Sequence, residues 1–225
     1  MRVVLTREAG YNERQRDWLT GHAHVDEVPL TTTLPLDQEI VDAQVAALSA
    51  RHVRYIVVSS ARGANCGARA ARVLGAPLLS VGASTSAALR ARGLEVRAEA
   101  ASASDLAPLV DEGPVLSLGA AETRPELADA LAARGIETLH VACYETRALE
   151  LTEAQRDLLA RGDVVLIGAP SAWARAREHV AASAWVVVPG ETTHTCVRRD
   201  HERVLVGWSS DLATRLASLG PESAQ

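Results

Sequence analysis

The sequence predicts an α/β protein with mostly parallel sheets, assembled from two similar halves of one chain. Short apolar segments alternate with amphipathic segments of about 10–15 residues, a pattern typical of strands connected by covering helices. The segment Tyr55–Ser59 is apolar nearly throughout, as expected for a strand with helices on both faces of its sheet. A set of sequence landmarks also occurs twice in the same order, which indicates an internal duplication.

Three pairs of landmarks carry the duplication, and their members are separated by 109, 108 and 106 residues. In order, they are an apolar run ending in small residues, a glycine followed by hydroxyl residues, and the tetrapeptide Ser-Asp-Leu-Ala. The pairs are Ser60 with Ala169, Gly82 with Gly190, and Ser104–Ala107 with Ser210–Ala213. Because ligand sites often lie between related halves, we expect any ligand to lie between these two.

The beginning of each half is predicted to be a strand, a helix and a strand. These are residues 2–6, 11–21 and 24–30 in the first half, and 115–118, 124–134 and 136–142 in the second. A glycine closes each helix, Gly21 in the first half and Gly135 in the second.

The stretches Leu30–Leu36 and Tyr144–Leu151 lack a helical period and are rich in Thr, Pro and Leu. We expect them to be extended connectors at which two lobes hinge. The segment Ser84–Arg92 begins with hydroxyl residues that can cap a helix and ends before Gly93, so it predicts a helix.

The composition, 48% hydrophobic and 23% charged over 225 residues, is typical of a globular protein. The chain has no Lys, which excludes a Schiff-base nucleophile, a pyridoxal-phosphate site and a Walker A loop. A net charge of −5 without a basic run argues against nucleic acid as a partner. No apolar segment approaches the roughly 18–20 residues that cross a bilayer, and no signal peptide is recognised, so we expect no membrane partner and a cytoplasmic location.

The sequence contains little that indicates a metal site or a cofactor site. Three cysteines are widely spaced and in no Cys-x-x-Cys arrangement, as expected of free thiols: Cys66, Cys143 and Cys196. His22 and His24 alternate along a strand-like segment without a third ligand nearby. The remaining possible ligands have no recognised zinc spacing: His194, Cys196 and His201. We therefore expect no metal site and no cofactor.

The repeated sites share one design, in which a strand ends at a hydroxyl-bearing turn and a helix begins. A helix N-terminus presents unpaired N–H groups and a partial positive charge, which favour an anion. The hydroxyl groups expected there belong to Ser59, Ser60, Thr85, Thr192 and Thr193. They suit a ligand with several carboxylates or phosphates. The alternative is that each only caps its helix, a common role of Ser and Thr.

Two further side chains are candidates for contact with such a ligand. Arg62 follows the first hydroxyl-bearing turn, and its guanidinium suits a bidentate contact with a carboxylate. The alternative for Arg62 is a solvent-exposed helical arginine. Tyr144 ends a predicted strand where a connector begins, so it could donate a proton or a hydrogen bond. The alternative for Tyr144 is packing at an interface.

In the order and spacing of these motifs, the chain resembles the uroporphyrinogen-III synthase family nearly from end to end. Leu5-Thr6-Arg7 with Pro29-Leu30 is similar to the family's opening strand and helix. Family motifs and their counterparts here are Phe-Thr-Ser-x-Arg/Asn at Val58–Gly63, Val-Gly-x-x-Thr-Ala at Val81–Ala87, Tyr-x-Thr at Tyr144–Thr146, Ser-Pro-Ser-Ala at Pro170–Ala172, and Gly-Pro-Thr-Thr at Gly190–Thr193.

The resemblance implies two similar, doubly wound parallel-sheet lobes joined by a two-stranded linker, with a ligand cleft between them. Lobe 1 would comprise residues 1–32 and 151–225, and lobe 2 residues 37–143. Residues 33–36 and 144–150 would form the linker.

The resemblance also implies the reaction. The substrate would be hydroxymethylbilane, a linear tetrapyrrole with eight carboxylates, and the product uroporphyrinogen III, with ring D inverted on closure, in haem biosynthesis. The enzyme would be a cyclising hydro-lyase that needs no cofactor and acts as a monomer. Tyr144 would be the catalytic residue. The substrate-binding residues would be Ser59, Ser60, Arg62, Thr85, Ser171, Thr192 and Thr193.

Some positions depart from the family pattern. Val58 and Ile167 replace the strand-end Phe, and Gly168 and Ala169 replace a hydroxyl pair. Glu191 replaces a proline and adds a negative charge. The alternative is therefore a diverged, non-catalytic paralogue that binds a tetrapyrrole or another polyanion.

Overall fold

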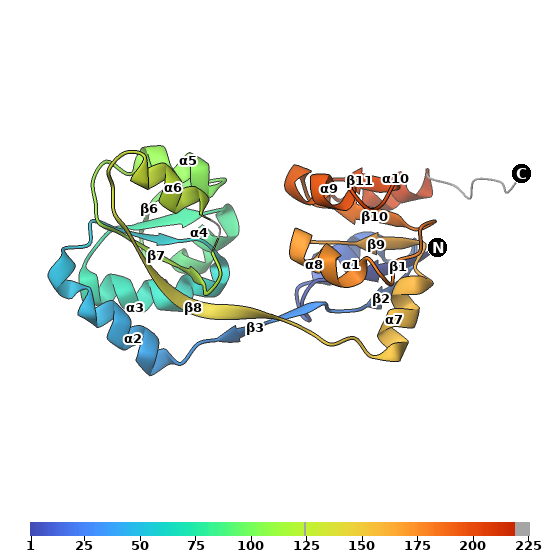
Figure 1. The fold of residues 1–225 in the computed structure, drawn as a ribbon, viewed down its shortest axis with the longest axis horizontal. Helices are drawn as coiled ribbons and strands as arrows, with labels where there is room; N and C mark the ends of the chain where they lie inside the picture. Colours follow the sequence, from blue (N-terminus) through green and yellow to red (C-terminus); the bar gives the residue numbers. More distant parts are fainter. Residues whose placement is uncertain (124, 219–225) are drawn as a thin grey trace, which may run out of the picture. The chain divides into compact units, whose positions relative to one another are not determined.

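The computed structural model describes residues 1–123 and 125–218. The chain forms two compact units (Figure 1). Unit 1 comprises Met1–Thr32 and the chain from Arg147 onward, and unit 2 comprises Thr33–Thr146. Residue 124, where a helix was predicted to begin, and residues 219–225 of the predicted lobe 1 lie outside the described residues.

Unit 1 contains a five-stranded sheet in the order β11-β10-β9-β1-β2, and its strand pairs are parallel. The strands are β1 (Arg2–Leu5), β2 (His24–Glu27), β9 (Val164–Leu166), β10 (Trp185–Val188) and β11 (Val204–Val206). They are short and mostly Val and Leu, as expected of strands that are covered on both faces.

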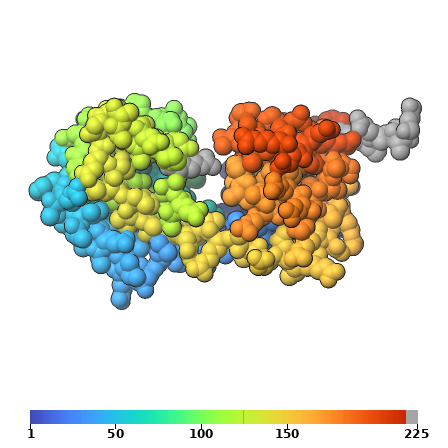
Figure 2. Space-filling view, in the orientation of Figure 1, coloured from blue at the N-terminus to red at the C-terminus, as the bar shows by residue number. Residues whose placement is uncertain are grey.

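Helices cover both faces of this sheet (Figure 1). One core cluster joins the sheet to α7 (Glu153–Ala160), α8 (Pro170–Ala176) and α9 (Glu191–Val197). The other joins it to α1 (Glu13–Leu19) and α10 (Leu212–Ala217). In the space-filling view, the visible face of unit 1 is formed mainly by the chain from α7 onward (Figure 2).

Unit 2 contains a six-stranded sheet in the order β3-β8-β7-β4-β5-β6. The strands are β3 (Thr31–Pro35), β4 (Tyr55–Val58), β5 (Leu78–Val81), β6 (Val96–Ala100), β7 (Val115–Ala120) and β8 (Thr138–Ala148). The pairs from β6 through β8 are parallel.

β3 and β8 carry the chain between the two units, and they run antiparallel. The amide of Leu36 donates to the carbonyl of Cys143 (3.1 Å), and the amide of Leu149 donates to the carbonyl of Leu30 (3.0 Å). The residues predicted to be linkers, 33–36 and 144–150, lie in or beside these two strands.

Helices also cover both faces of the unit 2 sheet. One cluster includes α2 (Gln38–Ala47), α3 (Ala64–Leu74) and α4 (Ala83–Arg90). The other includes α5 (Ala103–Leu106) and α6 (Glu126–Ala132). Short 3-10 turns lie at η1 (Ser49–Arg51), η2 (Ala61–Gly63) and η3 (Ala107–Leu109).

The two sheets share one strand order when strands are matched by their place in each half. The strand order β2-β1-β9-β10-β11 in unit 1 corresponds to the order β8-β7-β4-β5-β6 in unit 2. The predicted α/β class with doubly wound parallel sheets is confirmed. The repeated strand order agrees with the predicted duplication, which stays an inference from the sequence offsets.

Element boundaries differ from the predictions for local reasons. β2 ends at Glu27 rather than at residue 30, where Pro29 has no N–H group for a sheet hydrogen bond. α1 ends at Leu19, and Gly21 follows with φ of +78°. Gly135 has a similar φ of +71° after α6, as expected for glycines that terminate helices. Among the residues described, no helix has both the length and the apolar character needed to cross a membrane.

Candidate functional site

The most informative place in each unit is where the chain reverses its path across the sheet. In open α/β sheets, ligands bind beyond the carboxyl ends of the strands at this switch point. In unit 2 it lies between β4 and β7, because the chain runs from β4 to β6 in one direction and from β7 to β8 in the other. Ser59 and Ser60 follow β4, and Gly119 and Ala120 end β7.

Ser59, which follows β4, forms hydrogen bonds to the neighbouring strand β7. Its amide and its Oγ both donate to the carbonyl of Leu118, at 3.2 and 3.3 Å. A Cβ atom on Gly119 would lie 2.6 Å from the Ser59 Oγ, so glycine gives the serine side chain room. The predicted site residue Ser59 therefore lies at the switch point with its hydroxyl group bonded to the backbone of β7.

The next residues form a tight turn that presents Arg62. The Ser60 Oγ accepts a hydrogen bond from the Arg62 amide (3.3 Å) and caps η2. Arg62 itself is exposed. The turn also contacts α4 and β7. Ser60 therefore has the capping role that was the alternative for it, and it also fixes the backbone from which Arg62 extends.

Thr85 lies in the first turn of α4, the helix after β5. Gly82 precedes this helix with φ of +82°, a left-handed conformation that favours glycine. The Thr85 side chain is 2% exposed, and Ser86 beside it bonds through its Oγ to the Ser80 Oγ at 2.6 Å. Because α4 contacts η2, the structure brings the segment with Thr85 against the turn with Arg62.

Tyr144 lies inside β8, where a connector was predicted to begin. It is 7% exposed and belongs to the core cluster that also contains Val58, the last residue of β4, and Leu118 of β7. Its carbonyl accepts a hydrogen bond from the Ala121 amide (2.7 Å), at an irregularity in the β7–β8 pairing. Tyr144 thus lies in the core beneath the switch point.

In unit 1 the predicted residues lie on two short helices that contact each other, α8 and α9. Ser171 is exposed on α8, and Thr192 is exposed on α9. Thr193 is 5% exposed and faces the core. At the start of α9, the Glu191 carboxylate contacts Nδ1 of His194 at 3.1 Å.

A group at the switch point of unit 1, between β1 and β9, was not predicted as a site residue from the sequence. The guanidinium of Arg7, two residues beyond the end of β1, lies 5.9 Å from the ring centroids of both Tyr11 and Trp208. A Cβ atom on Gly168 would lie 3.3 Å from Cη2 of Trp208 and 3.8 Å from Cγ of Arg7. A larger residue at position 168 would therefore crowd Trp208, which explains the glycine. The position of Arg7 directly after an apolar strand was the available signal.

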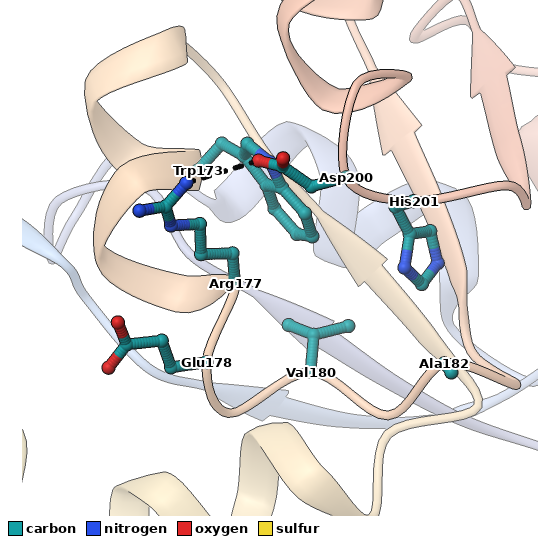
Figure 3. Close-up of a pocket in the computed structure, with 7 residues that line it drawn as sticks. All are labelled: Trp173, Arg177, Glu178, Val180, Ala182, Asp200 and His201. Atoms are coloured by element: carbon teal, nitrogen blue, oxygen red, sulfur yellow. Dashed lines mark hydrogen bonds and ion pairs between the residues drawn. The ribbon is translucent and has the colours of Figure 1, made fainter.

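A cavity of about 430 Å³ in unit 1 lies away from these residues (Figure 3). Its lining comprises Trp173, Arg177, Glu178, Val180, Ala182, Asp200 and His201. Trp173 Nε1 and Arg177 both donate to Asp200 Oδ2, at 3.3 and 3.2 Å. His201 bonds through Nε2 to the carbonyl of Ala184 at 2.8 Å. Because its polar groups largely bond one another, the cavity is typical of a structural feature.

A second cavity, of about 760 Å³, lies at the amino ends of the unit 1 strands. Met1, Asp163 and Trp185 are among the residues that line it. This edge is opposite to the one at which ligands of parallel sheets bind. Within residues 1–123 and 125–218, no three His, Cys, Asp or Glu side chains gather as metal ligands would.

Comparisons with known proteins agree with the sequence motifs. The family model of uroporphyrinogen-III synthase HemD matches residues 20–204. No curated protein sequence matches the chain.

Solved structures share the fold, among them two uroporphyrinogen III synthases. The uroporphyrinogen-III synthetase of Helicobacter pylori is 18% identical with a TM-score of 0.67, covering 98% of this chain and 100% of its own. A mutant uroporphyrinogen III synthase of the extremely thermophilic bacterium Thermus thermophilus is 18% identical with a TM-score of 0.65, covering 97% of each chain.

Proposed function

Because the chain belongs to the uroporphyrinogen-III synthase family, we propose that it closes hydroxymethylbilane to uroporphyrinogen III with inversion of ring D. The match to the family model over residues 20–204 is the observation that carries this proposal. The hydroxyl groups and Arg62 at the switch point of unit 2 support it, because they suit the carboxylates of such a substrate.

The proposed reaction requires little covalent chemistry from the protein. Loss of the hydroxymethyl hydroxyl group gives an azafulvene, which ring D attacks through its substituted carbon to give a spiro intermediate. The protein must hold the chain so that this carbon, and not its neighbour, meets the electrophile. Orientation of this kind can supply roughly 7–11 kcal/mol in favourable intramolecular reactions. A site made of hydroxyl groups and an arginine is sufficient for that task.

We assign the carboxylate contacts to two sets of side chains. In unit 2 they are Ser59, Ser60, Arg62 and Thr85. In unit 1 they are Ser171, Thr192 and Thr193. Arg62 contributes most to the binding of the carboxylates in this assignment, since a charge-assisted, bidentate contact is stronger than a neutral hydroxyl contact.

We assign to Tyr144 the donation of a proton to the departing hydroxyl group. A phenol surrounded by an apolar core forms stronger hydrogen bonds than one in water, which favours such a role. The low exposure of Tyr144, 7%, requires that the leaving group reach the edge of the core.

The test is closure of hydroxymethylbilane by the full chain, with isomers I and III separated after oxidation to porphyrins. Closure without inversion of ring D gives isomer I. We expect isomer III to predominate and to form in proportion to protein concentration. Isomer I at the level of the protein-free reaction would refute the proposal.

The role of Tyr144 is tested by Tyr144→Phe, which removes only the hydroxyl group. We expect kcat for isomer III to fall by about 10²–10⁴-fold, the range typical of a general acid. Tyr55→Phe is the matched control, because Tyr55 is also buried in unit 2 but belongs to the other core cluster. Unchanged turnover of Tyr144→Phe would remove this residue from the mechanism.

A second function is favoured by particular positions in unit 1. The Glu191 side chain is 78% exposed at the first position of α9, where an acidic ligand would be repelled. Gly168 and Ala169 offer no hydroxyl groups. These features suit a non-catalytic protein that binds a tetrapyrrole through unit 2. Binding of uroporphyrin III without formation of isomer III would identify that function.

A further inference from the structure

An arginine lies over two aromatic rings at the switch point of unit 1. The Arg7 guanidinium is 5.9 Å from the ring centroid of Tyr11 and 5.9 Å from that of Trp208. Distances below about 6 Å are typical of cation–π contacts. Such a contact uses the positive charge of a guanidinium and does not occupy its N–H donors, which suit a carboxylate.

Two buried polar side chains hold the backbone around Arg7. The Thr6 Oγ1 donates to the carbonyl of Leu166, the last residue of β9, at 2.5 Å. The Asn12 Nδ2 donates to the carbonyl of Arg7 itself at 3.1 Å. The main chain at Arg7 is therefore fixed both to the neighbouring strand and to the residue that precedes α1.

Trp208, two residues beyond the end of β11, is held in place by hydrogen bonds to the same sheet. Its Nε1 donates to the carbonyl of Val187 in β10 at 3.2 Å. The amide of Gly207 donates to the carbonyl of Val188 at 2.8 Å. Arg215 of α10 donates to the carbonyl of Gly207 at 3.1 Å. The position of the indole is therefore fixed independently of its contact with the guanidinium.

The indole lies where the other half of the chain carries a hydroxyl residue. Gly168 follows Ser59 by 109 residues, the same offset as that of the first pair of duplicated landmarks. A Cβ atom on Gly168 would lie 3.3 Å from Cη2 of Trp208 and 3.8 Å from Cγ of Arg7. Unit 1 therefore has an indole and a guanidinium where unit 2 has the hydroxyl group of Ser59.

We propose that Arg7, positioned by Trp208 and Tyr11, is a residue through which unit 1 binds a carboxylate of the tetrapyrrole. This contact takes the place of the hydroxyl group that is missing at Gly168. The contacts of the guanidinium with both rings, and its location at the carboxyl edge of the sheet, carry the proposal. It rests on the proposed function, which supplies a ligand with several carboxylates.

The aromatic rings favour binding in two ways. An arginine side chain loses rotamer freedom when it binds a ligand, and this loss weakens binding. Trp208 restricts the Arg7 side chain in advance, so less freedom is lost. The ring also excludes water from one side of the guanidinium, which strengthens the attraction to a carboxylate. Removal of the indole should therefore weaken binding only through Arg7.

The role of Arg7 is tested by isothermal titration of the full chain with uroporphyrin III. We expect Arg7→Gln to weaken binding about tenfold, as for loss of a charge-assisted hydrogen bond. Arg7→Lys should weaken it less, because lysine keeps the charge. Arg14→Gln, an exposed position on α1, is the matched control and should bind as the wild type does. Wild-type affinity in Arg7→Gln overturns the proposal.

The positioning role is tested by a double-mutant cycle with the same titration. Trp208→Leu should weaken binding about threefold in the wild-type background and cause no further loss in the Arg7→Gln background. Tyr11→Leu repeats the cycle at a residue that is 46% exposed, where replacement of the ring leaves the core intact. Equal losses in both backgrounds would show that the rings do not act through Arg7.

Turnover measurements distinguish loss of the Arg7 contact from absence of the synthase reaction. Arg7→Gln should raise KM for hydroxymethylbilane about tenfold and leave kcat nearly unchanged, as expected when substrate binding alone is weakened. A wild type that forms isomer III, together with an unchanged KM in Arg7→Gln, refutes the Arg7 contact alone. A wild type that binds uroporphyrin III without forming isomer III refutes the synthase reaction, and the titrations still decide whether Arg7 binds a carboxylate.

Discussion

The carboxyl edges of the two sheets share a strand order but present different side chains at the switch point. In unit 2, Ser59 places its hydroxyl group against Gly119, and Arg62 follows in a capped turn. In unit 1, Gly168 follows β9, and Trp208 lies against this glycine beside Arg7. Strand order therefore determines where a site can form, and the residues at the strand ends determine what it can bind.

The helices that follow these strands differ in the same way. α3 in unit 2 approaches the sheet through small residues, and a Cβ atom on Gly67 would lie 2.8 Å from Cγ2 of Val58. α8 in unit 1 instead buries Trp173, which is 2% exposed. Trp18, Trp185 and Trp208 also belong to unit 1, so all four tryptophans of the chain report on that unit. Tryptophan fluorescence can therefore distinguish unfolding of unit 1 from unfolding of unit 2.

The largest expected effect is on unit 1. Trp173→Ala should lower the free energy of unfolding by about 3–5 kcal/mol, because it leaves a cavity where a buried indole was. The measurement is urea denaturation followed by the fluorescence of the three remaining tryptophans. Trp173→Phe, which keeps much of the side-chain volume, should lower the free energy of unfolding by a smaller amount. If the fluorescence midpoint of Trp173→Ala matches that of the wild type, the packing account of α8 is wrong.

A smaller loss is expected from overpacking in unit 2. Gly67→Val should destabilise this unit by about 1–3 kcal/mol, because the new side chain meets Val58 and Leu89. Far-UV circular dichroism should report the loss, while the tryptophan fluorescence midpoint should move less. Val73→Ala is the control on the same helix, since Val73 is 52% exposed. Identical shifts of both signals would show that the units unfold together.

Removing buried hydroxyl groups compares ligand binding by the two units. Thr85→Val and Thr193→Val each keep the shape of a buried side chain and remove its hydroxyl group. If each hydroxyl group binds a carboxylate, affinity for uroporphyrin III should fall about fivefold, which corresponds to about 1 kcal/mol. Isothermal titration measures this, with Ser84→Ala as an exposed control in the turn of Thr85. A loss confined to Thr85→Val would assign recognition to unit 2 alone.

The smallest effect is a pH dependence expected in unit 2. The hydrogen bond from Tyr55 to Asp111 (2.5 Å) lowers the pKa of Asp111 below its usual 3.8. A lowered pKa in the folded state adds stability above the unfolded value, and this stability is lost as pH falls through the folded value.

Tyr55→Phe should therefore make the stability of unit 2 less dependent on pH below about pH 4. Circular dichroism of urea unfolding between about pH 3 and 6, compared with tryptophan fluorescence from unit 1, measures the difference. An unchanged pH dependence of the circular dichroism transition would exclude the Tyr55–Asp111 contact as its cause.

Features that depend on local sequence were predicted well. The apolar run at Tyr55–Ser59 gave β4 because a strand covered on both faces must be apolar throughout. The glycines after α1 and α6 were found because a left-handed residue favours glycine. β8 was predicted six residues short, at Ala142 rather than Ala148, because it is extended by pairing with the distant strand β3.

Contacts between distant segments were not predictable in the same way. The Arg7 guanidinium lies 5.9 Å from the ring centroid of Trp208 only because the fold of unit 1 brings distant segments together. The sequence placed Tyr144 at a strand end, but not in the core, because burial depends on what α3 and α4 cover. The hydroxyl groups of Ser59 and Ser60 were located by the strand-end pattern, whereas their hydrogen-bond partners were not.

The central claim is that the turn after β4 binds a carboxylate of a tetrapyrrole through Arg62. Isothermal titration of uroporphyrin III with the wild type, Arg62→Gln and the exposed control Arg72→Gln tests this most directly. We predict that Arg62→Gln weakens binding by about 10–100-fold, as expected for loss of a charge-assisted hydrogen bond, while Arg72→Gln binds as the wild type does. Equal affinities of the wild type and Arg62→Gln would contradict the claim.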